Sequence, residues 1–73
     1  MDPDEWYAQG EQLPTPDERL AYYQAGINLT PIFQVLAWQG IGNAHRDLGD
    51  SVEAGISFAN AAELNCMTLN QQR

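Results

Sequence analysis

The stretch WQGIGNAHRDLGDSVEAGISFANAAELNC, residues 38–66, carries the markers of a helix, a tight turn and a second helix. Gly49 stands where a residue in the left-handed conformation commonly closes a helix. Asp50 follows at once, and Glu53 comes three residues later, which is the capping-box spacing that starts a helix. Because so short a connection makes neighbouring helices antiparallel, the stretch predicts a helical hairpin.

Three further helix starts lie upstream of this hairpin, and each has a proline in the first helical position. Proline is well tolerated there because its missing N–H would have found no partner inside the helix. A capping residue precedes each proline, which gives the pairs Asp2-Pro3, Thr15-Pro16 and Thr30-Pro31. We therefore expect an all-α fold of two antiparallel helical hairpins packed side by side. The four predicted helices span about 3–13, 16–29, 31–48 and 51–65.

Apolar residues recur at helical spacing along both helices of the second hairpin. We expect these stripes to face the core, with Gly42 and Ala54 small enough to let the two helices approach closely. The stripe of the earlier helix comprises Phe33, Leu36, Ala37, Ile41, Ala44 and Leu48. The stripe of the later helix comprises Val52, Ile56, Ala59 and Ala62, widened by Phe58 and Ala61.

Length and charge limit what the chain can do. Its 73 residues are enough for one small domain, which we place at residues 1–66, with a C-terminal tail at 67–73. Ten acidic residues face three arginines and no lysine, so the net charge is −7. That balance disfavours binding to nucleic acids and to anionic membranes, because both rely on basic side chains. A basic or neutral protein partner remains compatible with this charge, although an acidic surface more often serves solubility.

Cysteine usage and the N-terminus bear on the compartment. A single cysteine, Cys66, allows no intramolecular disulfide, and the acidic, proline-broken N-terminus does not resemble a secretory signal. No apolar run is long enough to cross a membrane. We therefore expect a cytoplasmic protein without membrane insertion.

Large and small residues in the second hairpin follow a known pattern. Trp38, Ile41-Gly42 and His45 reproduce the motif W-x₂-L-G-x₂-Y, with Ile for Leu and His for Tyr. With these matches, residues 38–66 resemble one whole tetratricopeptide repeat. The later matches are Ala54, Phe58 and Ala61, with Cys66 in place of the usual proline.

Residues 3–31 are a looser copy, which resembles a degenerate repeat of the same family. Trp6 and Gly10 reproduce the opening, but Arg19 and Gly26 stand where the family has alanine. A plain helical hairpin of another family remains the alternative for this half. If both halves are repeats, the resemblance implies a right-handed stack of two helical pairs.

The resemblance also implies a site, because the first helix of each pair in this family lines a concave face that binds peptides. On this chain Tyr7 and Glu11 would come from the first helix, and Gln39, Asn43 and Arg46 from the third. An amide and a guanidinium in a row could hold a peptide backbone or a carboxylate. Ordinary solvated surface is an equally favoured interpretation of these residues.

The sequence favours a protein-interaction module, such as an adaptor, an assembly factor or a regulatory subunit, over an enzyme. A self-assembling or scaffold-docked subunit is the alternative. A small hydrolase using His45 is least favoured, because a lone histidine has no second catalytic group in view and is better explained by packing. We expect no catalytic residue, no metal site and no cofactor.

The open end of the stack is a further expectation. Repeat arrays normally need about three pairs, and this chain has two at most. We therefore expect the third and fourth helices to contact a second copy of the chain or another protein, with Met67 and Leu69 at that edge. A piece of a longer repeat array is equally compatible with the sequence.

Overall fold

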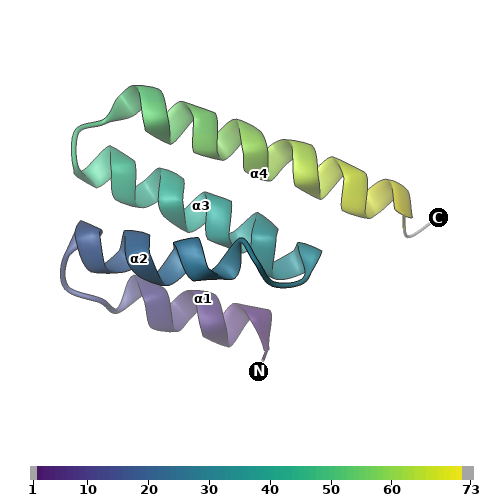
Figure 1. Cartoon of the computed structure of the whole chain (residues 1–73), viewed down its shortest axis with the longest axis horizontal. Helices are drawn as coiled ribbons and strands as arrows, with labels where there is room; N and C mark the ends of the chain where they lie inside the picture. Colours follow the sequence, from purple (N-terminus) through teal and green to yellow (C-terminus); the bar gives the residue numbers. More distant parts are fainter. Residues whose placement is uncertain (1, 72–73) are drawn as a thin grey trace.

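The computed structural model describes residues 2–71, with side chains described for residues 2–66, and its architecture is all-helical (Figure 1). The helices are α1 (Pro3–Glu11), α2 (Pro16–Gly26), α3 (Pro31–Asp47) and α4 (Ser51–Gln71). Successive helices run antiparallel and lie beside one another in chain order, and residues 2–71 contain no strand. The predicted all-α fold of helical hairpins is confirmed.

All four predicted helix starts are confirmed, and three of them have the expected side-chain cap. The Asp4 backbone N–H donates to Asp2 Oδ1 at 3.2 Å, and the Glu18 N–H donates to Thr15 Oγ1 at the same distance. At the start of α4, the Glu53 N–H donates to Asp50 Oδ1 at 3.4 Å. The exceptional start is α3, whose Thr30 makes no side-chain cap. There Gln34 Nε2 instead donates to the Leu29 carbonyl, 2.9 Å away.

The helix ends differ more from the prediction. α1 ends at Glu11 and α2 at Gly26, two and three residues earlier than expected. α4 continues to Gln71, so the predicted end near Asn65 is wrong, and the backbone of residues 67–71 belongs to the helix. No proline or glycine interrupts residues 56–71, and Cys66 can continue a helix that a proline would stop. The predicted turn at Gly49 is present, with φ of 83°.

The core lies where α3 meets α1 and α2. The Tyr23 side chain of α2 is fully buried there, and its ring occupies the space left by two glycines of the flanking helices. A Cβ added to Gly10 would lie 2.5 Å from Tyr23 Cζ, and one on Gly40 would overlap the other side of the ring. Trp6 packs edge-on against Tyr23, with ring centroids 5.5 Å apart. One aromatic side chain thus joins three helices.

The packing of α4 corrects the predicted stripe. Within the described residues α4 contacts only α3, and the side chains that it buries are Ala54, Ser57 and Ala61. Val52 is 71% exposed and Ile56 51% exposed, on the side of α4 that points away from α3. Small side chains allow a short distance between helix axes, whereas β-branched residues at the contact would hold the helices apart. The row of small residues therefore takes the inner side.

Gly42 and Ala54 do lie at the α3–α4 contact, as the sequence predicts. The ring of Phe58 rests on Gly42, and a Cβ added there would lie 2.7 Å from Phe58 Cε1. Phe58 is nevertheless 36% exposed, so this contact borders on solvent. The second hairpin is held by small, shallow contacts.

Candidate functional site

Three of the five predicted concave-face residues lie together in a hydrogen-bonded network. Asn43 Nδ2 of α3 donates to the Tyr7 hydroxyl of α1 at 3.1 Å. The Tyr23 hydroxyl lies 2.8 Å from Glu11 Oε1 and 2.9 Å from the Tyr7 carbonyl oxygen, and its single proton is shared between these two acceptors. Tyr23, the centre of this network, is not among the predicted site residues, because it comes from α2 and no motif joins it to α1 and α3.

The electrostatics of this network keep its phenols neutral. Burial, and then the hydrogen bond to the Glu11 carboxylate, raise the pKa of Tyr23 far above its ordinary value. Burial, and then the negative charge of Glu11, also raise the pKa of Tyr7. A phenol that keeps its proton at neutral pH cannot serve as a general base. The network therefore acts as a clamp between α1, α2 and α3, and it uses polar atoms that a bound peptide would need.

The other two predicted concave-face residues, Gln39 and Arg46, are exposed on α3. Neither takes part in the network around Tyr23. The five predicted residues thus divide into three that belong to the clamp, of which Glu11 is itself exposed, and two that take no part in it.

A second polar contact involves Arg19, which stands where the repeat motif would have alanine. The Arg19 guanidinium lies 2.7 Å from Asp47 Oδ2, and the Arg19 side chain is only 17% exposed. This pair joins the first turn of α2 to the last turn of α3. Arg19, which departs from the repeat pattern, therefore has a structural partner in the other hairpin.

His45 lies in the last turn of α3, just before the connection to α4, and is partly buried. Its Nδ1 atom is 3.8 Å from Asp50 Oδ2, while Asp50 Oδ1 accepts the capping hydrogen bond from Glu53. The geometry ties the two side chains to the turn. In the described part of the chain, no three His, Cys, Asp or Glu side chains gather closely enough to hold a metal ion.

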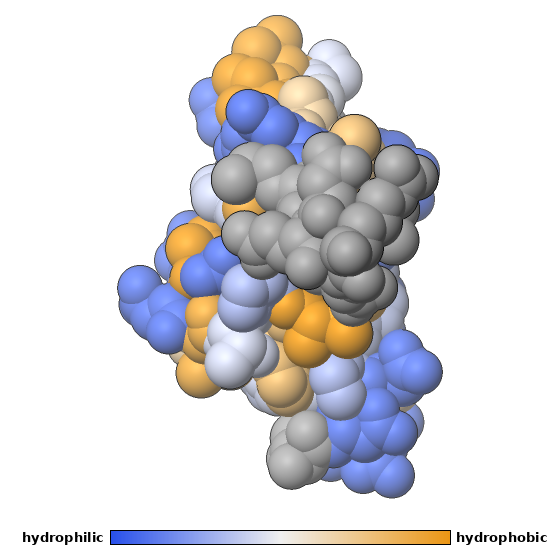
Figure 2. Space-filling model, turned by 90° about the vertical axis from the view of Figure 1, so that its right-hand side faces the viewer, coloured by the Kyte–Doolittle hydropathy of each residue, from blue (hydrophilic) through white to orange (hydrophobic). Residues whose placement is uncertain are grey.

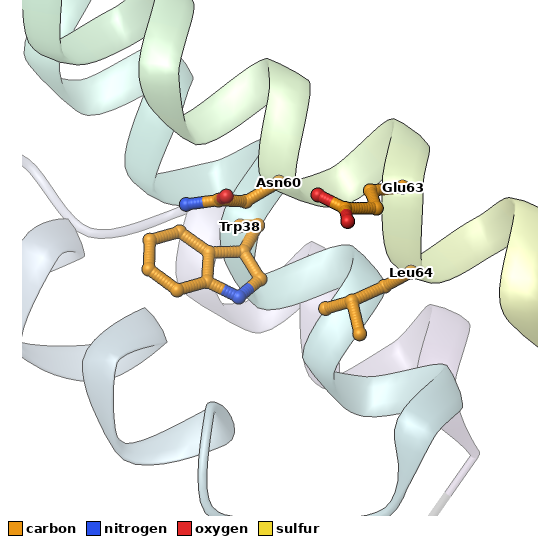
Figure 3. A pocket seen from close by; sticks show the side chains of 4 residues that line it. All are labelled: Trp38, Asn60, Glu63 and Leu64. Atoms are coloured by element: carbon orange, nitrogen blue, oxygen red, sulfur yellow. The ribbon is translucent and has the colours of Figure 1, made fainter.

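An open pocket lies between α3 and α4 (Figure 3). Trp38 of α3 lines one side, and Asn60, Glu63 and Leu64 of α4 line the other; the volume is about 280 Å³. Figure 3 shows the Asn60 amide above the indole, the Glu63 carboxylate turned toward the same space, and the Leu64 side chain pointing toward the indole. Sequence reasoning missed this pocket, because its residues come from two helices and no motif joins them.

The outer face of α4, defined here as Val52, Ile56, Ala59 and Glu63, is exposed throughout. These residues are separated by four, three and four positions, so they line one side of the helix. Figure 2 shows hydrophobic surface at the top of the molecule, at the height of α4 in Figure 1. The backbone of Met67 and Leu69 belongs to the end of α4, but their side chains lie outside the described part of the chain.

None of the helices, over the residues described, combines the length and apolar character that a membrane span requires. Comparisons of the chain with protein-family models, with curated proteins and with solved structures found no match. The resemblance to the tetratricopeptide family therefore stays a prediction from the sequence.

Proposed function

We propose that the chain is a protein-interaction module, which performs no chemistry and binds a segment of another protein on the outer face of α4. One observation carries the proposal: Val52 and Ile56 are mostly exposed on a helix whose opposite side alone contacts the described chain. Burying one such side chain stabilises a complex by about 1.5–3 kcal/mol, so the face offers a gain that folding leaves unused. Exposed apolar patches rimmed by polar residues typically mark interaction sites.

The outer face of α4 is also the binding surface that the resemblance to helical repeats would predict. In a stacked array, each helical pair buries one face on the previous pair and offers another to the next. α4 is the last described helix, and its outer face lies where a following pair would pack. The exposed thiol of Cys66 suits a reducing compartment, so we place the interaction in the cytoplasm.

Photo-crosslinking tests this proposal in the source cell. A photo-reactive residue at Ala59, which is exposed in the middle of the outer face, should capture a defined protein that mass spectrometry identifies. Ile56→Glu should abolish the crosslink, because it buries a charge at the contact. Ile32→Glu is the matched control, since Ile32 is 53% exposed on α3, and it should leave the crosslink intact. Capture that survives Ile56→Glu contradicts the proposal.

Self-assembly is the second candidate, and the low charge of the outer face favours it. Glu63 is the only charged residue among the four, although the chain carries a net charge of −7. Two copies could therefore meet through this face in a two-fold contact with little local repulsion. Sedimentation should then show a dimer that Val52→Glu dissociates. A strictly monomeric chain at high concentration excludes this candidate.

A further inference from the structure

The pocket beside the outer face of α4 has a chemistry of its own. Its lining combines the indole of Trp38, the carboxylate of Glu63 and the amide of Asn60. An aromatic face attracts cations through its quadrupole, and a carboxylate accepts hydrogen bonds from ammonium or guanidinium groups. The pocket therefore offers acceptors and a π-face to a positive group, and it offers no cationic side chain to a negative one.

The size of the pocket limits its occupant. A volume of about 280 Å³ lies below the roughly 300–1,000 Å³ typical of pockets for whole small molecules. One long side chain fits this space better than a cofactor does. A lysine or arginine also has an aliphatic stem, which can pack against the Leu64 side chain while its head reaches the Trp38 ring.

The charge of the chain indicates where such a side chain would come from. The chain has no lysine, and one of its three arginines, Arg19, is already paired with Asp47. A second copy therefore has little positive charge to offer, whereas a basic partner is attracted by the net charge of −7. Charge complementarity thus favours a foreign protein with a basic segment.

We propose that the pocket receives a lysine or arginine side chain of the protein that contacts the outer face of α4. This inference rests on the function proposed above and adds the chemistry of the partner. Glu63 belongs both to the pocket and to the outer face, so one segment can bury an apolar side chain on Ile56 and reach Trp38 with a basic one. The partner segment then carries apolar and basic residues together.

A titration of the isolated chain tests the pocket without a partner. The probe is N-acetyl-arginine amide, whose ends are uncharged, and the reference is N-acetyl-citrulline amide, its neutral isostere. The two indole N–H signals of Trp6 and Trp38 are followed by NMR at constant ionic strength. Because Trp6 is buried in the α1–α3 core, only the Trp38 signal should shift and saturate, at concentrations on the order of 10 mM.

Two matched variants test whether the Glu63 carboxylate binds the arginine amide. Glu63→Gln should weaken binding of the arginine amide by about fivefold, which corresponds to the loss of one exposed ion pair. Glu53→Gln changes the net charge equally on the same helix and should leave the affinity unchanged. Equal shifts with the citrulline amide, or equal affinity for the Glu63→Gln variant, would overturn the proposal.

The partner experiment separates this inference from the function on which it rests. Glu63→Gln should also weaken the Ala59 crosslink to the foreign protein. If the crosslink depends on Ile56 but the arginine amide fails to bind, the cationic pocket is wrong and the interaction module stands. If no Ile56-dependent crosslink forms, the interaction module is wrong, and the basic partner proposed here falls with it.

Discussion

The contact among α1, α2 and α3 and the contact between α3 and α4 use different physical means. The first buries a whole tyrosine between two glycines and surrounds it with Trp6, Tyr22 and Tyr7. Its polar atoms are satisfied through the Glu11 and Asn43 hydrogen bonds. The second relies on Ala54, Ser57 and Ala61, with the half-exposed Phe58 at its border.

The two contacts differ in how much apolar area each side chain buries. A large aromatic side chain buries more apolar area than alanine or serine, so each side chain at the first contact contributes more to stability than one at the second. Two large apolar residues of the first half of α4, Val52 and Ile56, remain outside, whereas Phe58 rests on Gly42. Elements with few buried apolar contacts also open locally at lower free energy. The contrast is consistent with the proposal that α4 binds the partner while the first three helices support it.

The largest expected loss of stability comes from removing the buried aromatic side chain at the contact among α1, α2 and α3. Tyr23→Ala removes a fully buried aromatic side chain and should lower the free energy of unfolding by about 3–5 kcal/mol. Val52→Ala removes an exposed side chain of the second hairpin and should change it by less than about 0.5 kcal/mol. Urea unfolding followed by circular dichroism measures both. Similar losses for the two variants would show that Val52 contributes to the packing of the chain and does not lie on an exposed outer face.

A glycine-to-alanine series at three helical positions sharpens the comparison. Alanine gains roughly 0.8–1 kcal/mol of helix propensity over glycine at each. At Gly40 the new methyl overlaps the fully buried Tyr23, so overpacking of about 1–3 kcal/mol should dominate. At Gly42 the obstacle is the half-exposed Phe58, which can turn aside, so the net effect should be near zero. At Gly55 nothing lies within 4 Å, and the variant should be more stable.

Thermal melting of the three variants should therefore give the order Gly55→Ala, Gly42→Ala, Gly40→Ala, from the highest midpoint to the lowest. A Gly42→Ala midpoint as low as that of Gly40→Ala would mean that Phe58 is held as firmly as Tyr23. The contact between α3 and α4 would then be as rigid as the first.

The features predicted best from the sequence are those decided by neighbouring residues. A cap and a proline act within one helical turn, and all four helix starts, at Pro3, Pro16, Pro31 and Ser51, are found where they were expected. Helix ends depend on how far packing extends a helix, so α2 ended early and α4 continued past Asn65. The all-α fold follows from the starts alone.

The inner side of α4 could not be predicted from hydrophobicity. Val52 and Ile56 are the most apolar residues of its first half, yet the helix turns Ala54 and Ser57 toward α3. Distance between helix axes, which only the three-dimensional packing defines, decided this in favour of small residues. The row of small residues is visible in the sequence, but hydrophobicity alone does not mark it as the inner side of the helix.

The candidate site shows the same limit. The predicted concave-face residues of a helix lie on one side of it, which periodicity can show. Periodicity cannot show that Tyr23, from another helix, forms hydrogen bonds with Glu11 and with the Tyr7 carbonyl. The pocket at Trp38 needs the register between α3 and α4, which no single helix pattern contains. Periodicity along a single helix thus cannot predict contacts between helices.

A smaller effect is expected from the hydroxyl at the centre of the clamp. Tyr23→Phe keeps the ring and loses the hydrogen bonds to Glu11 and to the Tyr7 carbonyl, so stability at pH 7 should fall by about 1–2 kcal/mol. Because folding raises the pKa of Tyr23, this contribution is fully present below the ordinary value of 10.0 and is lost as the pH rises above it.

The difference between the wild type and Tyr23→Phe should therefore shrink between pH 8 and pH 11 in urea unfolding. Tyr7 also has a raised pKa, so the variant should retain part of the alkaline loss of stability. A difference that stays constant across this range would show that the Tyr23 proton does not take part in the clamp.

The smallest effect is expected at the ion pair that joins α2 to α3. Arg19 and Asp47 lie 2.7 Å apart, but the Asp47 side chain is 48% exposed, so solvent screens the pair and its coupling should be about 0.2–1 kcal/mol. A double-mutant cycle with Arg19→Gln and Asp47→Asn isolates this coupling from the effect of each side chain alone. The coupling should fall toward zero in 1 M salt, where the Debye length is only about 3 Å.

His45 and Asp50 provide the contrast in the second hairpin, because their atoms are 3.8 Å apart and the pair is charged only when the imidazole is protonated. If the Arg19–Asp47 coupling is absent even at low salt, the first three helices are held by their aromatic core alone, and the contrast with the small-residue contact of α4 becomes one of packing only.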